Sequence, residues 1–140
     1  MDQLRFKIQK INTYKFETSD FLDTSTDKVR LEMKIDFKKI EANIIEVVVR
    51  FKFYRGDITN EIINISVGMI YDIHPEDFAG FIQNDGAIII PQELAVYLSG
   101  LVIGTTRGIL SVRTESTKFS QFIIPPTTLD TTILSDIKIT

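Results

Sequence analysis

Apolar and charged residues alternate along three segments of the chain. Val29–Lys38, Ile45–Tyr54 and Ile63–Tyr71 each carry apolar side chains at every second position. In the first segment every interleaved residue from Arg30 to Lys38 is charged. Because successive side chains of a strand point to opposite faces, this pattern predicts three strands with one apolar face each.

A fourth strand is expected near the N-terminus, at about Leu4–Thr18. The alternation slips there near Ile11, which indicates a β-bulge. The links Lys39–Asn43 and Arg55–Asn60 are short enough for hairpins. We therefore expect one antiparallel sheet whose apolar face must be covered by other elements.

Helical signals follow the strands. His74–Asn84 contains a proline and an acidic first turn, and it predicts one or two helical turns. Pro91–Arg113 predicts a long helix, with Pro91 at the first helical position. One face of this helix should be buried, formed by Leu94, Leu98, Leu101, Thr105, Gly108 and Val112. The expected fold class is α+β: a four-stranded antiparallel sheet with a long helix and a short helical segment on one face.

The C-terminal part of the chain shows weaker patterns. Phe119–Pro126 is an extended apolar stretch that ends in two prolines, and the β-branched residues of Thr127–Thr140 disfavour a stable helix. We expect a single domain over residues 1–140. Residues 1–73 would form the sheet, 74–126 the helical part and 127–140 a C-terminal tail.

Composition excludes several classes of site. The chain has 140 residues, of which 44% are hydrophobic and 25% charged, as in ordinary globular proteins. Without cysteine it can have no disulfide, thiol nucleophile or cysteine-ligated zinc, and one histidine excludes a multi-histidine metal site within one chain. A net charge of -3 gives no bulk positive charge to attract nucleic acid. We therefore expect no metal, no cofactor and no nucleic-acid partner.

The sequence also bears on location. Met1–Lys10 carries charged residues and no apolar core, so no signal peptide is expected. No apolar run is as long as a membrane span. The expectation is a cytoplasmic protein that does not insert into membranes.

Three glycines recur every fourth residue within the predicted long helix: Gly100, Gly104 and Gly108. Each one costs the helix about 0.8–1 kcal/mol relative to alanine. Such a repeat allows close approach of another backbone. That neighbour is either the domain's own sheet or another subunit, and the sequence favours neither.

Other conspicuous residues have simpler explanations. Arg55-Gly56-Asp57 matches a cell-adhesion tripeptide, but glycine and aspartate are ordinary turn residues. His74, before a proline, is expected to order a loop or lie in solvent, since a catalytic histidine needs partners. Gly68 within a strand indicates a bulge or a close backbone approach. The lysines and arginines of the polar sheet face are interleaved with acidic residues, which predicts a mixed-charge surface.

The chain has more large apolar residues than one sheet and one helix obviously bury. The excess includes phenylalanines near residues 16–21, 78–81 and 119–122, and the isoleucines of 88–90. Either flanking loops fold over the core, or subunit interfaces and an open apolar groove use these residues.

Several of these segments, taken in order, resemble the SecB family of protein-export chaperones. The similarity extends from about Leu4 to Leu129. The matching segments are FKIQKI (Phe6–Ile11), IEVVVRFKF (Ile45–Phe53), GMIYDI (Gly68–Ile73), YLSGLVIGTTRGIL (Tyr97–Leu110) and FIIPPTTL (Phe122–Leu129). The GTTRG segment and the Thr-Glu stretch after the predicted helix resemble a divergent SecB-like branch.

The resemblance implies a fold, an assembly and a function. SecB-like proteins have a four-stranded antiparallel sheet with long helices on one side, and they assemble as a dimer of dimers. They hold unfolded polypeptides or preproteins in apolar grooves without ATP, and some relatives protect an antitoxin. By position in this layout, the groove candidates are Phe21, Leu22, Phe78, Phe81, Ile82, Phe119, Phe122 and Ile124, with Gly100, Gly104 and Gly108 for helix packing or an oligomer interface.

The sequence departs from the family at the features that serve the SecA motor. A second C-terminal helix is not evident, and the cysteine-containing zinc tail is missing. Of the acidic positions that contact SecA, Glu17 aligns, the position near Asn64 is not acidic, and the third falls in a gap around Tyr14–Lys15. SecA therefore stays a possible partner that these residues only partly support.

Three functional hypotheses follow. The first is an ATP-independent holdase, with client backbone also able to pair with exposed strand edges. The second is a dedicated chaperone for one client, such as an antitoxin or one secreted protein. The third is an enzyme or small-ligand binder, which the lone histidine and the lack of nucleotide motifs make the weakest; we expect no catalytic residue.

Overall fold

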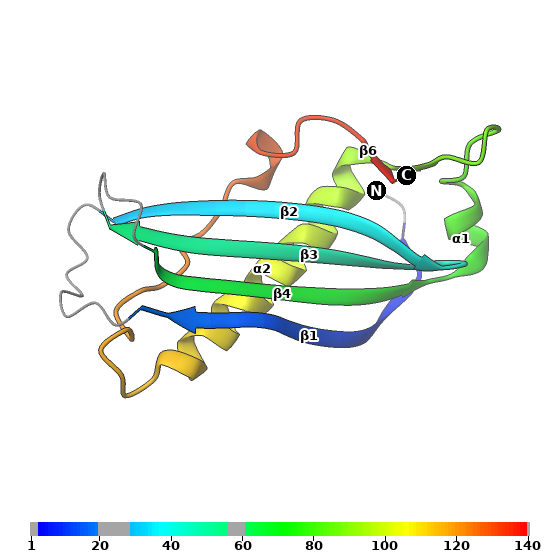
Figure 1. The fold of residues 1–140 in the computed structure, drawn as a ribbon. Helices are drawn as coiled ribbons and strands as arrows, with labels where there is room; N and C mark the ends of the chain where they lie inside the picture. The colour runs from blue at the N-terminus through cyan, green and yellow to red at the C-terminus, as the bar shows by residue number, and fades with distance from the viewer. Residues whose placement is uncertain (1–2, 20–28, 56–60, 140) are drawn as a thin grey trace.

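The computed structural model describes residues 3–19, 29–55 and 61–139. Four long strands form one antiparallel sheet in the order β1-β4-β3-β2 (Figure 1). They are β1 (Phe6–Thr18), β2 (Val29–Glu41), β3 (Ile44–Arg55) and β4 (Glu61–Ile73). The following elements are α1 (Pro75–Ala79), β5 (Ile88–Ile90), α2 (Gln92–Thr114), the 3₁₀ turn η1 (Leu129–Thr131) and β6 (Ile137–Ile139). The predicted α+β class is confirmed.

The alternation of the sequence sets the two faces of the sheet. The apolar residues of β3 face those of β4 in register, as in Val49 opposite Val67 and Phe51 opposite Ile65. These central residues are buried and form the middle of the core. The interleaved residues of β3 and β4 lie on the opposite, outer face, as the period-two pattern predicts.

The phase slip in the first strand corresponds to two irregularities. The register of β1 against β4 shifts between Ile8 and Lys10 and again between Thr13 and Lys15. These two bulges flank Ile11, where the sequence pattern slips. They allow one strand to keep apolar residues on the inner face while it places Tyr14 over the outer face.

Helix α2 crosses the inner face diagonally behind the sheet (Figure 1). Its buried side consists of Leu94, Ala95, Leu98, Ser99, Val102, Ile103, Thr106, Leu110 and Thr114. The predicted buried face is correct for Leu94 and Leu98 but wrong at its far end, because Gly108 is exposed and Val112 is 71% exposed. The predicted residues keep the average helical spacing of about 3.6, whereas the buried residues recur at every fourth position, at Leu94, Leu98, Val102, Thr106, Leu110 and Thr114. The side that packs on the sheet therefore turns slowly around the helix axis, and a straight stripe does not follow it.

A buried tyrosine ties α2 to the sheet. The hydroxyl of Tyr71 in β4 donates to the carbonyl of Leu98 at 2.8 Å. Burial raises the pKa of Tyr71 above its ordinary value. The hydroxyl therefore stays protonated and keeps donating this bond.

By length and composition alone, α2 could cross a membrane. The sequence expectation that no segment qualifies is therefore wrong on those two criteria. In this fold one side of α2 packs on the sheet. A core helix of this kind satisfies the same criteria.

The short helix α1 is tied to the start of β1. His74 precedes α1, and its Nδ1 accepts the N–H of Glu76 at 3.2 Å, so this histidine orders a helix end. The guanidinium of Arg5 donates to Asp77 Oδ1 at 2.9 Å, and the backbone N–H of Arg5 donates to Oδ2 at 2.9 Å. These bonds hold the pKa of Asp77 down at about 2.

The C-terminal segment folds back onto the body of the chain. Strand β6 pairs antiparallel with β5, and Leu129, Ile133 and Ile139 are buried. At the start of α2, the N–H of Gln92 donates to Asp136 Oδ1 at 2.8 Å. Residues 127–139 contain no helix longer than η1, in agreement with their β-branched composition.

Candidate functional site

One helix is too narrow to cover this sheet. A helix with its side chains is about 10–12 Å wide, whereas four strands about 4.8 Å apart are wider. The inner residues of the two outer strands are accordingly only half-buried, including Leu31, Met33, Ile35 and Phe37 of β2. The apolar face of β2 is thus available for other contacts.

A groove of about 550 Å³ lies between β2 and the C-terminal segment. We call it the β2 groove. Its apolar lining is formed by Met33, Ile35, Phe37, Ile133, Leu134 and Ile137. Leu134 is 76% exposed, which makes it the most exposed large apolar side chain among the described residues.

Four polar or charged side chains complete the β2 groove: Asp36, Thr132, Ser135 and Lys138. Asp36 faces the Nζ of Lys34 at 4.0 Å. Lys138 comes from β6, which contacts β2. The groove therefore has a mixed lining, in which the polar surface is at least as extensive as the apolar surface.

A second, smaller hollow of about 250 Å³ lies near α1 and the start of α2. Its lining includes Leu4, Phe81 and Leu94 together with Asp77 and Glu93. Of these two hollows, only this one contains a groove candidate predicted from the sequence, namely Phe81.

Most of the predicted groove candidates lie in the core of the single chain. Phe78, Phe119, Phe122 and Ile124 are buried. The ring of Phe122 packs edge-on against Phe53 of β3, with centroids 5.8 Å apart. In this arrangement these four side chains already have apolar partners within the chain.

The remaining candidates are more accessible. Phe81 is half-buried beside Phe78, and Ile82 is 47% exposed. Phe21 and Leu22 lie outside the described residues. The candidates near α1 and those after α2 lie at opposite ends of the molecule, so the structure does not bring them together (Figure 1).

The glycine repeat faces away from the sheet. A Cβ atom added to Gly104 or Gly108 would meet no other atom within 4 Å, and one on Gly100 would make an ordinary contact with Leu129 at 3.7 Å. Packing on the chain's own sheet therefore does not require these glycines. An interface with another copy remains a prediction.

The exposed side of α2 carries little charge. Between Glu93 and Arg113 its one ionic side chain is Arg107, which donates to the carbonyls of Ile124 at 2.7 Å and Pro125 at 3.0 Å. The hydroxyl of Thr105 donates back to the Leu101 carbonyl at 2.9 Å. The side of the helix that faces away from the sheet is thus a narrow, nearly uncharged stripe, which we call the α2 stripe. It is formed by Tyr97, Gly100, Leu101, Gly104, Thr105, Gly108 and Val112.

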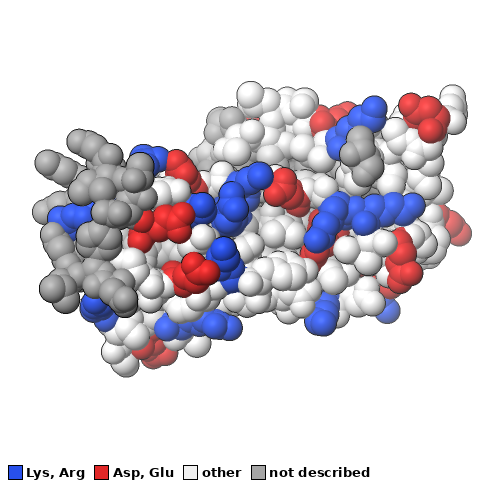
Figure 2. Space-filling model, in the orientation of Figure 1, with Lys and Arg blue, Asp and Glu red and all other residues white. Residues whose placement is uncertain are grey.

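The outer face of the sheet has mixed charge, as predicted (Figure 2). Lys34 pairs with Asp36, Lys38 with Glu46 at 3.0 Å, and Lys52 with Glu61 at 3.0 Å. Several lysines of this face are therefore paired with carboxylates, in agreement with the predicted mixed-charge surface. Lys39 belongs to the inner-face phase of β2, as its register opposite Ile45 shows.

A buried carboxylate lies at the centre of this outer face. Glu46 is 1% exposed, and its Oε2 accepts the hydroxyl of Tyr14 at 2.5 Å. The hydrogen bond to Glu46 raises the pKa of Tyr14 and also that of Lys38. Gly68 makes room for this cluster, since a Cβ there would lie 2.7 Å from the Tyr14 ring and would also collide with the Glu46 carboxylate.

The described residues contain no group of three or more histidine, aspartate or glutamate side chains arranged to hold a metal ion. His74 is used as a helix cap. Two residues of the Arg55-Gly56-Asp57 tripeptide, Gly56 and Asp57, lie outside the described part of the chain.

Sequence reasoning missed the residues of the β2 groove. The alternation of Val29–Lys38 predicts an inner face for Met33, Ile35 and Phe37, and Leu134 falls in the expected tail, but no pattern predicts that they line one groove. The sequence did contain a signal for this groove. The fully charged interleaved residues indicate that one face of β2 is solvated. An outer strand of a four-stranded sheet also extends past a single covering helix, which leaves its apolar face partly uncovered.

A comparison with solved structures found a similar fold in a SecB-like chaperone of Mycobacterium tuberculosis, solved in complex with a ChAD peptide from an antitoxin. The TM-score is 0.55 and the sequences are 8% identical, over 88% of this chain and 91% of the other. A protein of unknown function from Streptococcus agalactiae has a TM-score of 0.35 and 12% identity, over 89% and 99% of the two chains. Protein-family models and curated protein sequences gave no match. The fold is thus similar to that of a SecB-like chaperone, at low sequence identity.

Proposed function

We propose that this chain is a chaperone that holds non-native polypeptide segments in the β2 groove without ATP. The observation that carries the proposal is this open groove, in which six apolar side chains meet, on a fold similar to a SecB-like chaperone whose structure contains a bound antitoxin peptide. We assign the client to this groove because Phe78, Phe119 and Phe122, three of the groove candidates predicted from the sequence, are buried in the single chain.

The chemistry of the β2 groove suits clients of varied sequence. Contact between apolar surfaces is non-directional, so many side chains can occupy the same lining. Binding to a non-native state retards aggregation by mass action and needs no catalytic group. Exposed Leu134 and half-buried Met33 would supply such contacts on opposite walls of the groove.

Self-association through the α2 stripe is part of the proposal. Gly104 and Gly108 cost helix stability and face open space, and both are explained if another copy packs closely there. The resemblance to SecB implies a dimer of dimers. Several grooves on one assembly would raise the effective concentration of binding sites for one long client.

A dedicated chaperone for one client is the alternative, since the similar M. tuberculosis chaperone was solved with an antitoxin peptide. Recovery of one predominant partner from cells would favour it. Delivery to SecA in protein export is not part of our proposal, because Glu17 lies opposite the uncharged Asn64 and 3.7 Å from Lys15.

The first experiment is dilution of a chemically denatured, slow-folding test protein, with and without this chain and without ATP. The proposal expects suppression of light scattering at a near-stoichiometric ratio. Unchanged aggregation in the presence of the folded chain would contradict general holding and leave the dedicated client as the alternative.

Three matched variants locate the client surface, each placing an aspartate at an exposed apolar position. Leu134→Asp changes the β2 groove, Ile82→Asp the region near α1, and Ile123→Asp the segment after α2, where Ile123 is 64% exposed. We expect Leu134→Asp alone to weaken suppression several-fold, with circular dichroism unchanged for all three. A loss at Ile82 or Ile123 instead would place the client elsewhere.

A further inference from the structure

The cross-strand register arranges the side chains of the outer face in rows that cross the sheet. Lys34 of β2 lies opposite Arg50 of β3. Arg50 in turn lies opposite Ser66 of β4, and Ser66 lies opposite Lys15 of β1. We call these residues the central basic row. At a strand spacing of about 4.8 Å, the row is about 14 Å wide. Basic and acidic residues are interleaved along each strand, so the row becomes evident only from the register.

The rows on either side contain carboxylates, whereas the central basic row contains none. Glu32 and Glu17 belong to the row on one side, and Asp36 belongs to the row on the other. Figure 2 shows this face, with basic side chains from the β2 margin to the β1 margin and acidic side chains to both sides of them. Positive charge is therefore confined to a narrow row, in a chain whose net charge is -3.

The charges of the central basic row are poorly compensated within the chain. Arg50 is exposed and forms no ion pair with a described residue. The ammonium groups of Lys34 and Lys15 reach only along their own strands, to Asp36 at 4.0 Å and to Glu17 at 3.7 Å. Exposed pairs of this kind stabilise a chain weakly, and like charges directly opposite on neighbouring strands are destabilising. Packing within the single chain therefore does not explain the row.

A hollow beside the row gives an anionic group access to its cations. Its volume is about 420 Å³, and it is lined by Glu32, Met33, Lys34, Arg50 and Lys52. Lys52 is paired with Glu61 at 3.0 Å, which leaves Lys34 and Arg50 as the cations available there. Because these two come from neighbouring strands, one carboxylate between them can accept bonds from an ammonium and a guanidinium group.

Apolar surface borders the row on its other side. Val48 lies opposite Gly68, and the ring of Tyr14 covers Gly68, where an added Cβ atom would lie 2.7 Å from it. Tyr14 is 53% exposed and Val48 is half-buried. The flanking carboxylates of Glu17 and Asp36 repel a broad polyanion such as duplex nucleic acid. A narrow row of cations beside apolar side chains instead fits a polypeptide that carries both acidic and apolar residues.

We propose that the outer face of the sheet binds an acidic segment of a partner protein, laid across the strands along the central basic row, with an apolar side chain against Tyr14 and Val48. Alternate side chains of an extended segment repeat every 6.6–6.8 Å, so three successive carboxylates on one side of it span about 13–14 Å, which is the width of the row. This inference goes beyond the proposed function. The surface lies on the face opposite α2, so it is additional to the β2 groove.

The test uses a blocked, fluorescent nine-residue peptide with glutamate at three alternate positions, two leucines at one end and threonine elsewhere. A control peptide has glutamine in place of each glutamate. Fluorescence anisotropy measures binding to the full chain. We expect the glutamate peptide to bind about ten-fold or more tightly than the control, because only its carboxylates pair with the central basic row.

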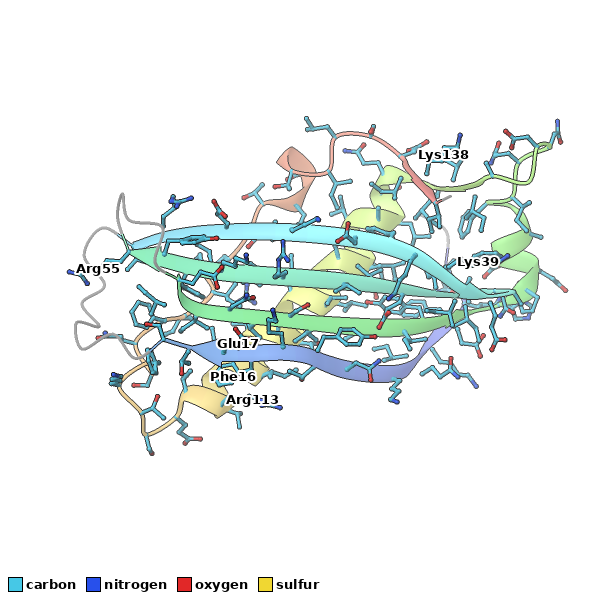
Figure 3. The ribbon with its side chains drawn as sticks, in the orientation of Figure 1. Phe16, Glu17, Lys39, Arg55, Arg113 and Lys138 are labelled. Atoms are coloured by element: carbon cyan, nitrogen blue, oxygen red, sulfur yellow. The ribbon has the colours of Figure 1, made fainter. Side chains whose placement is uncertain are left out.

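Matched variants locate the site of binding. Arg50→Gln should weaken binding of the glutamate peptide about three- to five-fold, the size of one exposed ion pair, and Lys34→Gln combined with it about ten-fold. Lys39→Gln removes the same charge from the inner-face phase of β2 and should leave binding unchanged. Figure 3 shows Lys39 near the right-hand end of the sheet, away from Glu17, whose row borders the central basic row.

Thermal unfolding separates lost binding from lost structure. Arg50→Gln removes a positive charge directly opposite Lys34, so it should not lower the thermal midpoint. Equal binding of the two peptides, or equal losses for Arg50→Gln and Lys39→Gln, would indicate a general charge effect and overturn the inference. Displacement of the peptide by short polyphosphate or single-stranded DNA at a lower concentration would overturn the assignment to a polypeptide partner.

The outcomes also separate this surface from the β2 groove. Leu134→Asp and Ile82→Asp make the same change in net charge and should bind the glutamate peptide equally. Weaker binding by Leu134→Asp alone would place the peptide in the β2 groove and contradict the inference. Suppressed aggregation by Arg50→Gln at the wild-type level, together with its weakened peptide binding, is the result expected for two independent surfaces.

Discussion

At the scale of single residues, the outer face of the sheet is organised around Gly68. Its missing side chain leaves the space in which Glu46 reaches both Tyr14 and Lys38. A carboxylate buried to this extent is tolerable because a hydroxyl and an ammonium group compensate its charge. This cluster links β1, β3 and β2 across the face opposite the helix.

We expect Gly68→Ala to lower the free energy of unfolding by about 1–3 kcal/mol, because the new methyl group displaces the Glu46 carboxylate and the Tyr14 ring. Without the cluster, alanine in a strand would be neutral or favourable relative to glycine. Urea denaturation followed by circular dichroism measures the change. Gly104→Ala is the control, since its methyl group meets nothing and should not destabilise the subunit. Equal stability of wild type and Gly68→Ala would mean that the cluster shifts at no cost.

Sequence alone indicated part of this arrangement. A glycine inside a strand predicts a close approach, and one is found, but the approaching groups are side chains rather than backbone. The sequence could not identify Tyr14 and Glu46 as the groups that approach Gly68. Tyr14 lies at an irregularity of β1, and the pattern near Ile11 does not give the exact position of that irregularity.

At the scale of elements, two charged links hold the ends of the chain's helices. Arg5 joins the start of β1 to α1 through Asp77, and the guanidinium of Arg113 lies over the ring of Phe16, 5.5 Å from its centroid, at the other end of β1 (Figure 3). Both links connect segments that are far apart in sequence. They fix α1 and the end of α2 against the same edge strand.

Stability should depend on pH through Asp77. Its pKa is lowered to about 2 in the folded chain, below the ordinary value of 3.8, by its bonds to Arg5. The stabilisation is therefore complete above about pH 4–5 and is lost as the pH falls through the folded value. We expect Asp77→Asn to lower the thermal midpoint at pH 7, with a smaller difference from wild type near pH 2.

Glu76→Gln is the matched control for this change. Glu76 is 3.4 Å from Arg5 and its side chain is 81% exposed, so its removal should have a smaller effect at pH 7. A pH-independent difference between Asp77→Asn and wild type would contradict the role given to the carboxylate.

Strand positions were predictable from the sequence, whereas the rotation of α2 was not. Period-two alternation sets a strand's face without ambiguity, since one residue of slip would expose every apolar side chain. On α2, leucine, valine, isoleucine and threonine occur on nearly all sides. Only packing distinguishes buried Val102 and Leu110 from exposed Val112.

At the scale of the whole molecule, the α2 stripe and the β2 groove are two separate surfaces that expose apolar side chains. The sequence indicated an apolar excess but not its distribution. Phe119 and Phe122 complete the core, whereas Leu134 at the C-terminal segment is exposed. Whether each of these side chains is buried or exposed depends on how the segment after α2 folds back onto the sheet. Local sequence patterns do not encode such long-range packing.

We expect the chain to sediment as a multiple of its 16.0 kDa mass and Gly104→Leu to sediment as a smaller species. The larger side chain blocks close helix approach, yet within one subunit its Cβ atom meets no other atom within 4 Å, and leucine favours the helix by about 0.5–1 kcal/mol relative to glycine. Analytical ultracentrifugation and thermal unfolding together measure both effects. Ser120→Leu adds the same side chain outside α2 and should change neither; an assembly that tolerates Gly104→Leu would exclude the α2 stripe as its interface.

Arg107 is folded back onto the carbonyls of Ile124 and Pro125, and this contact affects how self-association depends on ionic strength. With its charge engaged within the chain, the α2 stripe offers almost nothing for dissolved ions to screen. Added salt should therefore leave self-association through the α2 stripe unchanged, whereas an interface held by ion pairs would weaken. Sedimentation at increasing sodium chloride concentration distinguishes these two outcomes.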